Sequence, residues 1–225
     1  MNLWQAPRKA EAALNNELRP FASAYEDIFT VVDECAERLA HVDSPFARAS
    51  TIILIKWRNL VLGCYSLCLD GLAQEGGALL RPLIESLELL TYLRLDPRRV
   101  DSVLTDKPSA GAIAKEINGK FQGLREYLNL NSSHLSMTPY SVGHLIDLNT
   151  AKFRLVQQHN DAVLRQNLKT LLAVFGLLMV EVVNCVSVAS GAVDNVLADR
   201  AVAVKTQASS LLEWPNKSKY TDLHN

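Results

Sequence analysis

Apolar residues recur at intervals of three and four along most of this chain, and prolines divide the resulting segments from one another. That spacing is typical of amphipathic helices, which bury one face. We find no sustained alternation of apolar and polar residues and no good two-residue hairpin turn, so few strands are expected. The sequence therefore predicts an all-α fold, a single-domain helical bundle of about seven or eight helices.

The clearest helix start is Ser44-Pro45, a capping side chain followed by proline in the first turn. The helix it begins, Phe46–Asp70, is apolar nearly all round and is therefore expected at the centre of the bundle. A second central helix, Leu80–Leu95, follows a break or kink near Gly76–Pro82. We expect these two helices to pack as the central hairpin.

The same periodicity predicts helices on both sides of this hairpin. Residues 1–214 are expected to form one helical domain, and residues 215–225, which follow a proline, a flexible C-terminal tail. The remaining predicted helices are Pro7–Arg19, Phe21–His41, a short one from Pro97 toward Leu104, Ala110–Asn129, a short one over Val142–Leu148, Ala151–Ser190 and Asn195–Trp214.

The chain has 225 residues, a net charge of −1 and 48% hydrophobic residues, which excludes a disordered protein and leaves no electrostatic footprint for duplex DNA or an anionic membrane. Met1–Asn15 lacks the apolar core of a signal peptide. The apolar run Leu171–Val183 is interrupted by Glu181, so a buried core helix is favoured over a membrane span. These features predict a cytoplasmic protein without a membrane partner.

The four cysteines, Cys35, Cys64, Cys68 and Cys185, lie inside apolar helical patterns, which favours free buried thiols. Cys64 and Cys68 are one helical turn apart and could begin a metal site, but no further ligands stand at a suitable spacing. Small core side chains are the better interpretation. No metal and no cofactor is predicted, since no glycine-rich phosphate loop is present either.

The helix Leu80–Leu95 carries an unusual stripe of polar residues, Arg81, Glu85, Glu88 and Tyr92, which helical spacing places on one face. If the stripe faces water, Arg81 and Glu85 form an ordinary surface pair. If it faces inward, its charges must be paired with another polar cluster. On this helix alone the first interpretation is favoured, because exposed charge is the general rule.

A second polar cluster runs from Arg125 through Tyr127 to His134, with hydroxyl side chains directly before the histidine. A histidine after a helix end can act as an acid, a base or an oriented donor. It can equally tie a loop to a helix terminus. Both interpretations of His134 stay open.

Together, the spacing Arg81-x-x-x-Glu85 and the later segment from Tyr127 to His134 resemble the DUF5677 family of bacterial helical proteins. Asn131 stands where that pattern has a serine. The resemblance covers about residues 57–144 and implies an all-helical fold in which Arg81, Glu85, Tyr127 and His134 meet. It brings no established activity.

A weaker, fold-level analogy is with HEPN domains, helical bundles that are often metal-independent ribonucleases of defence and toxin systems. Arg125 and His134 stand farther apart than the arginine and histidine of that family. If the analogy held, His134 would be the base for a ribose 2′-hydroxyl, and Arg125 or Arg81 would stabilise phosphate charge.

Two functions from different classes follow. The first is a non-catalytic interaction or structural module, a possible homodimer, in which a buried Arg–Glu cluster, the Arg81–Glu85 pair, fixes the fold. The second is a ribonuclease or defence-associated protein that binds RNA and uses Arg81, Glu85, Tyr127 and His134. Since the sequence completes no catalytic set, we favour the first.

Overall fold

The computed structural model describes residues 4–106, 108–131, 145–147, 150–153 and 159–212. Helices account for 82% of these residues, which confirms the predicted all-α bundle. One short antiparallel ladder joins β1 (Ile146–Asp147) to β2 (Lys152–Phe153). Its turn includes Ala151, whose φ is 52°. His134 and the tail 215–225 lie outside the described residues.

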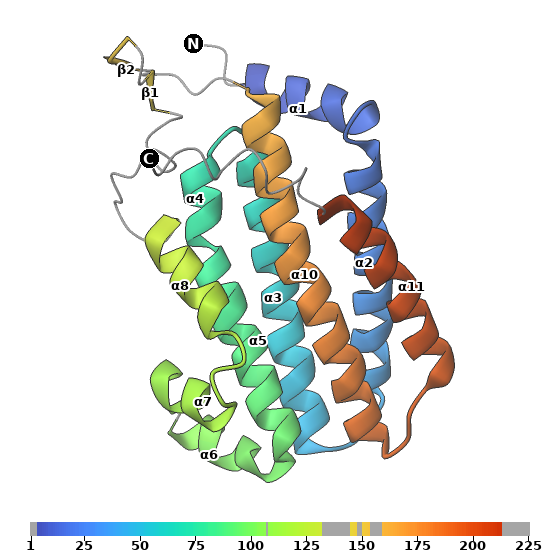
Figure 1. The fold of residues 1–225 in the computed structure, drawn as a ribbon. Coiled ribbons are helices and arrows are strands. Elements are labelled where there is room, and N and C mark those ends of the chain that lie inside the picture. The colour runs from blue at the N-terminus through green and yellow to red at the C-terminus, as the bar shows by residue number, and fades with distance from the viewer. Residues whose placement is uncertain (1–3, 107, 132–144, 148–149, 154–158, 213–225) are drawn as a thin grey trace.

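The helices have the following bounds: α1 Gln5–Asn15, α2 Arg19–Ala40, α3 Pro45–Leu69, α4 Ala73–Ala78, α5 Leu80–Leu95, the 3₁₀ turn η1 Pro97–Arg99, α6 Val100–Thr105, α7 Ala110–Glu116, α8 Gln122–Asn131, α10 Asp161–Ser190 and α11 Asn195–Leu212. In Figure 1 the long helices α2, α3, α5 and α10 run side by side along the molecule, and α11 lies over α2 and α10. The short helices α6, α7 and α8 form an outer layer beside α5.

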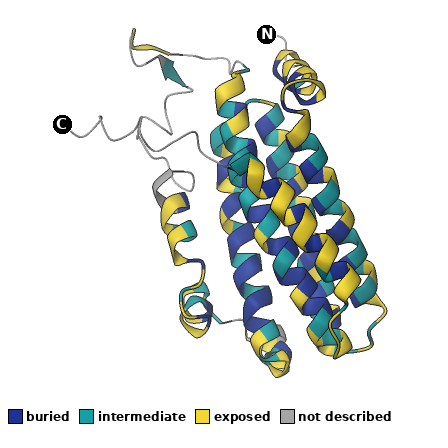
Figure 2. Ribbon diagram, turned by 45° about the vertical axis from the view of Figure 1, so that its right-hand side comes forward, coloured by how far each residue is buried: buried dark blue, intermediate teal, exposed yellow. Residues whose placement is uncertain are grey.

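Helix α10 is the centre of the bundle, because it packs against α2, α3, α5 and α11. The Asn160 side chain caps its start by accepting hydrogen bonds from the N–H groups of Ala162 and Val163. Its end is the left-handed Gly191, with φ of 70°, a conformation that favours glycine. The residues between are apolar on most sides, and Figure 2 shows buried residues on the inward faces of the long helices.

Aromatic rings fill the middle of this core. Phe175 of α10 lies with its ring centroid 4.6 Å from that of Phe29, 5.0 Å from that of Trp57 and 5.9 Å from that of Tyr25. The polar atoms of two of these rings find backbone partners. The Tyr25 hydroxyl donates to the carbonyl of Leu168, and the Trp57 indole N–H donates to the carbonyl of Leu83. The cluster therefore joins α2, α3, α5 and α10 without leaving a buried donor unpaired.

The predicted central hairpin is present as α3 packed against α5. Ser44 caps α3 as expected, accepting a hydrogen bond from the N–H of Ala47 at 3.1 Å. The predicted break near Gly76–Pro82 falls at Leu79, between α4 and α5. Gly76 of α4 lies close to α3, since an added Cβ would lie 3.3 Å from the Cys68 sulfur. All four cysteines are free and buried, as predicted.

Three predicted helices differ from the structure. Ala110–Asn129 is divided into α7 and α8, because Asn118 and Gly119 adopt left-handed φ values of 55° and 64° that end the first helix. The helix predicted over Val142–Leu148 is wrong at Ile146 and Asp147, which pair with β2 as a strand. Its remaining residues, apart from Leu145, lie outside the described chain. The long helix predicted from Ala151 begins only at Asp161, after the Asn160 cap.

Two helices, α3 and α10, are long and apolar enough to cross a membrane by length and composition. They differ in how they sit in the bundle. The most apolar window of α10 is 61% buried by other helices, as expected of a core helix, whereas that of α3 is only 28% buried. Length and composition alone therefore leave the location of the protein undecided, and the exposed part of α3 needs its own explanation.

Replacing Phe175 with alanine should lower the free energy of unfolding by about 3–5 kcal/mol, because it leaves a cavity among four helices. Chemical denaturation followed by Trp57 fluorescence and by circular dichroism measures this. Phe153→Ala is the matched control, since Phe153 is 74% exposed and its loss should change stability by less than about 0.5 kcal/mol. Equal effects of the two variants would contradict the central position of Phe175.

Candidate functional site

The polar stripe of α5 divides into an exposed half and a buried half. Arg81 and Glu85 form an i,i+4 pair at 3.2 Å, and their side chains keep 49% and 34% of their exposure. One and two turns further on, Glu88 and Tyr92 are buried. The Arg81–Glu85 pair is therefore a partly exposed contact within one helix, and the buried charge of the stripe is Glu88.

Glu88 is paired with Arg125 of α8, which packs against this part of α5. The nitrogen–oxygen distance is 2.5 Å, and the Glu88 side chain is 2% exposed. The second carboxylate oxygen of Glu88 and the Nε of Arg125 are buried without a hydrogen-bond partner among the described residues. Burial raises the pKa of the Glu88 carboxyl above its ordinary value, while the hydrogen bond and charge of Arg125 act in the opposite direction.

A second buried carboxylate, Glu181, lies in the middle of α10. Arg94 at the end of α5 donates a short hydrogen bond to one of its oxygens, and the ammonium of Lys120 lies 3.4 Å from the other. Lys120 belongs to the connection between α7 and α8. Two cations from different elements thus neutralise one carboxylate inside the apolar core.

Arg99 adds a third link between α5 and the outer layer. Its guanidinium donates to the carbonyl of Tyr92 at 3.2 Å and to the carboxylate of Glu116 in α7 at 3.1 Å. It also lies over the Tyr92 ring, 4.2 Å from the centroid. The segment containing α7 and α8 is therefore tied to α5 and α10 by charged contacts at Glu88, Glu181 and Arg99, in addition to its apolar packing.

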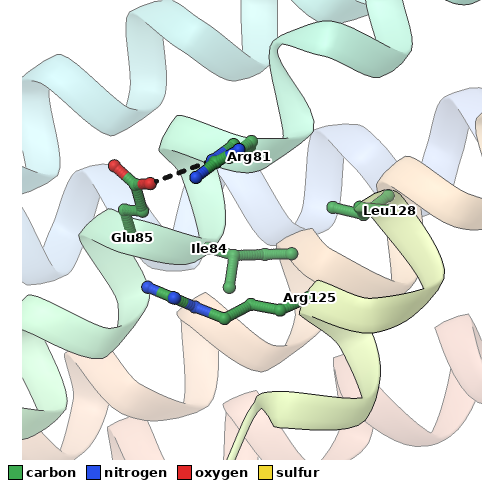
Figure 3. A pocket seen from close by; sticks show the side chains of 5 residues that line it. All are labelled: Arg81, Ile84, Glu85, Arg125 and Leu128. Atoms are coloured by element: carbon green, nitrogen blue, oxygen red, sulfur yellow. Dashed lines mark hydrogen bonds and ion pairs between the residues drawn. The ribbon is translucent and has the colours of Figure 1, made fainter. Parts of the chain in front are cut away.

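A small cavity lies between α5 and α8 beside these pairs (Figure 3). Figure 3 shows Arg81 directed at Glu85 on one side, while Arg125 extends from α8 toward α5 on the other. The volume of the cavity is about 20 Å³, enough for roughly one water molecule. Its lining residues are Arg81, Ile84, Glu85, Arg125 and Leu128.

Of the four residues predicted to form a site, the structure brings Arg81 and Glu85 together. Tyr127 lies on α8 with 37% of its surface exposed, and it is not among the residues that line the cavity. His134 lies outside the described residues, so its distance from the other three stays untested. Arg125, assigned to phosphate under the ribonuclease analogy, is instead paired with Glu88.

Two features of this region were not predicted from the sequence. One is the pairing of Glu88 with Arg125, and the other is the role of Glu181 with Arg94 and Lys120. A signal for Glu181 was present, because a carboxylate inside so apolar a helix must have cations beside it if it is buried. Which cations these are depends on the path of the chain through α7 and α8.

Comparisons of the chain with protein-family models, with curated proteins and with solved structures found no match. The resemblance to the DUF5677 family and the HEPN analogy therefore stay predictions. Within the described residues, no group of three or more histidine, cysteine, aspartate or glutamate side chains could hold a metal ion. The arrangement of charges between α5, α8 and α10 is thus the strongest indication of function.

Replacing Glu88 with glutamine should change how stability depends on pH. Because the folded protein raises the pKa of Glu88 above 4.5, this carboxyl stabilises the fold at pH values below 4.5 and loses that contribution as pH rises through its folded pKa. Relative to Glu88→Gln, the wild type should therefore lose stability as pH rises. Urea unfolding from acid to neutral pH measures the difference.

Glu85→Gln is the matched control for this titration, because Glu85 lies on the same helix and is part exposed. Because the charge of Glu85 is one of the causes that raise the pKa of Glu88, Glu85→Gln should keep the titration of Glu88 in weakened form. A Glu88→Gln curve that also runs parallel to the wild type would contradict the raised pKa of Glu88.

Proposed function

We propose that this protein is a non-catalytic helical interaction module whose buried ion pairs fix the position of its outer layer. The observation that carries the proposal is that each buried carboxylate, Glu88 and Glu181, is paired with a cation from a different element. A cytoplasmic location and self-association belong to the same proposal.

The energetics of burial support a structural role for these charges. Removing a carboxylate from water is costly, and only a close partner with hydrogen bonds offsets that cost. An ion pair between α5 and α8 forms only when the two helices have one particular relative position. The paired charges therefore favour that position over other arrangements in which the apolar faces of the helices could also pack. Selection of this kind is useful in a protein that must present a defined surface.

The cavity beside the pairs also favours a structural role. With room for about one water molecule, it does not admit a nucleotide or other substrate of that size in the described conformation. A water molecule there would lie close to Arg81 and Arg125. It would offer an acceptor to Arg125, whose Nε has no hydrogen-bond partner among the described residues.

Replacing Arg125 with alanine should lower the free energy of unfolding by about 3 kcal/mol, because it strands the Glu88 carboxylate in a buried position. This loss of unfolding free energy is at the lower end of the range for buried ion pairs, since the Glu88 carboxylate can take up a proton when Arg125 is removed. The matched control is Arg81→Ala, which removes a part-exposed partner and should cost no more than about 1 kcal/mol. Chemical denaturation measures both.

Hydrogen exchange adds a local test of the same proposal. In Arg125→Ala, amide protection should fall in α8, Gln122–Asn131, and stay unchanged in the middle of α10. If Arg125→Ala and Arg81→Ala were equally stable and α8 kept its protection, the buried pair would not fix the outer layer and the proposal would fail.

A second candidate, a ribonuclease or defence-associated function, is favoured by one observation. Arg81 and Arg125 line the same cavity, and two guanidinium groups could stabilise the charge of an RNA phosphate. The chemistry would then require His134 as the base, with Glu85 and Tyr127 as its polar neighbours.

Incubation with labelled RNA separates the two candidates. If the protein is a non-catalytic module, the substitutions Arg81→Ala and His134→Ala should not reduce any RNA cleavage that is measured with the wild type. Cleavage by the wild type that is lost in both variants, while their circular dichroism is unchanged, would establish the second candidate and overturn the first.

A further inference from the structure

The outer face of α3 carries apolar side chains that the bundle does not cover. Ile52, Ile55 and Leu62 are 55%, 51% and 39% exposed, although they belong to the helix expected to be most central. Exposed branched residues at three- and four-residue spacing are typical of a helix that packs against a partner helix. We call this stripe the α3 seam; its residues are Arg48, Ile52, Ile55, Lys56, Asn59, Leu62, Gly63, Ser66 and Asp70.

The α3 seam has an order that a random apolar patch would lack. Asn59 stands at its middle, and the large apolar residues Ile52 and Ile55 precede it. At the corresponding positions after Asn59 stand Ser66 and Gly63, which are small. Ile52 and Ser66 stand seven residues before and after Asn59, and Ile55 and Gly63 stand four residues before and after it. Each of these two pairs of positions therefore holds one large and one small residue.

The charges of the α3 seam follow the same order. Arg48 stands eleven residues before Asn59, and Asp70 stands eleven residues after it. Both are exposed, and Arg48 also lies beside the exposed Asp43, at 2.6 Å. If a second α3 lay antiparallel with Asn59 at the crossing point, each Arg48 would face an Asp70, whereas a parallel arrangement would place like charges together.

From this self-complementary pattern we infer that the α3 seam binds a second copy of this chain, in an antiparallel, two-fold symmetric dimer. Large side chains then meet small ones, as knobs meet holes in helix packing. Leu62 lies against the alkyl stem of Lys56, and the two Asn59 amides meet at the symmetry axis, where a polar residue fixes register. A two-fold axis requires that the same surface serve both partners, which this order satisfies.

The size of the α3 seam sets the expected strength of the dimer. From Arg48 to Asp70 the segment is about 33 Å long and about 10–12 Å wide, so each partner covers roughly 350 Å², which is the size of a weak, transient interface. A reversible dimer with a dissociation constant in the micromolar range is therefore expected. This inference rests on the proposed function in one respect, that the protein acts by binding, but its residues lie on a different helix from Glu88 and Arg125.

Sedimentation over a range of concentrations tests the dimer directly. The wild type should shift from monomer to dimer in the micromolar range, and Ile55→Asp should weaken association at least about tenfold, since a symmetric dimer contains each substitution twice. Val196→Asp is the matched control, because Val196 is also apolar and is 78% exposed but lies on α11. It should associate like the wild type. A wild type that stays monomeric up to millimolar concentration would overturn the inference.

Cysteine cross-linking tests the antiparallel order. The four native cysteines are buried, so the wild type should not react with a short bis-maleimide. A mixture of Arg48→Cys and Asp70→Cys should give a product containing one of each chain, and neither variant alone should cross-link with itself. Self-linking of each single variant would establish a parallel dimer and overturn the order inferred from the charges.

Two further measurements separate this inference from its competitors. Vesicles of neutral lipid should not bind the wild type; binding that Ile55→Asp abolishes, without self-association, would assign the α3 seam to a membrane instead. The unfolding of Ile55→Asp should match that of the wild type monomer, whereas Arg125→Ala should unfold more readily and still form dimers. The α3 inference and the proposed role of the ion pairs can therefore fail separately.

Discussion

The rest of the structure depends on the need to surround α10, whose thirty residues are apolar on most sides. A helix of this composition is stable in water only if neighbours remove most of its surface from solvent. Helices α2, α3, α5 and α11 meet this need, and the rings around Phe175 fill the space where three of them converge. Short connections join α2 to α3 and α10 to α11, whereas the outer layer α6–α8 comes between α5 and α10 in the chain.

Glu181 makes the same requirement more specific. A carboxylate within α10 cannot be covered by apolar side chains alone, so the chain must bring cations to it. Arg94 comes from a neighbouring long helix, but Lys120 comes from the connection between two short ones. The outer layer is therefore part of the core in an electrostatic sense, although most of its surface faces solvent. Glu88 and Arg125 repeat this arrangement one helix further out.

The sequence predicts the fold well, because its helices are specified locally. The Ser44 cap and the break near Gly76–Pro82 act within a few residues and are read directly from the chain. The break at Asn118 was not foreseen, since asparagine in a left-handed conformation leaves only a weak local signal. The partners of Glu88 and Glu181 were missed for a different reason: they are 37 and up to 87 residues away in the chain, so only the tertiary fold defines them.

The contrast between α3 and α10 shows what the folded structure adds to composition. Both helices are apolar enough in sequence to be assigned to the core, yet the most apolar window of α10 is 61% buried and that of α3 only 28%. On α10 the apolar side chains are covered largely by other helices of the same chain, and its buried carboxylate, Glu181, is neutralised there. On α3 the inward face packs against α2, α5 and α10, while the outward face keeps isoleucine and leucine in contact with solvent. An apolar face that the bundle leaves uncovered has a cost in water, and that cost is removed when a complementary surface covers it. Since the nearest surface with matching large and small residues and opposite charges is the same face of another copy, the excess apolarity of α3 is better explained by assembly than by folding.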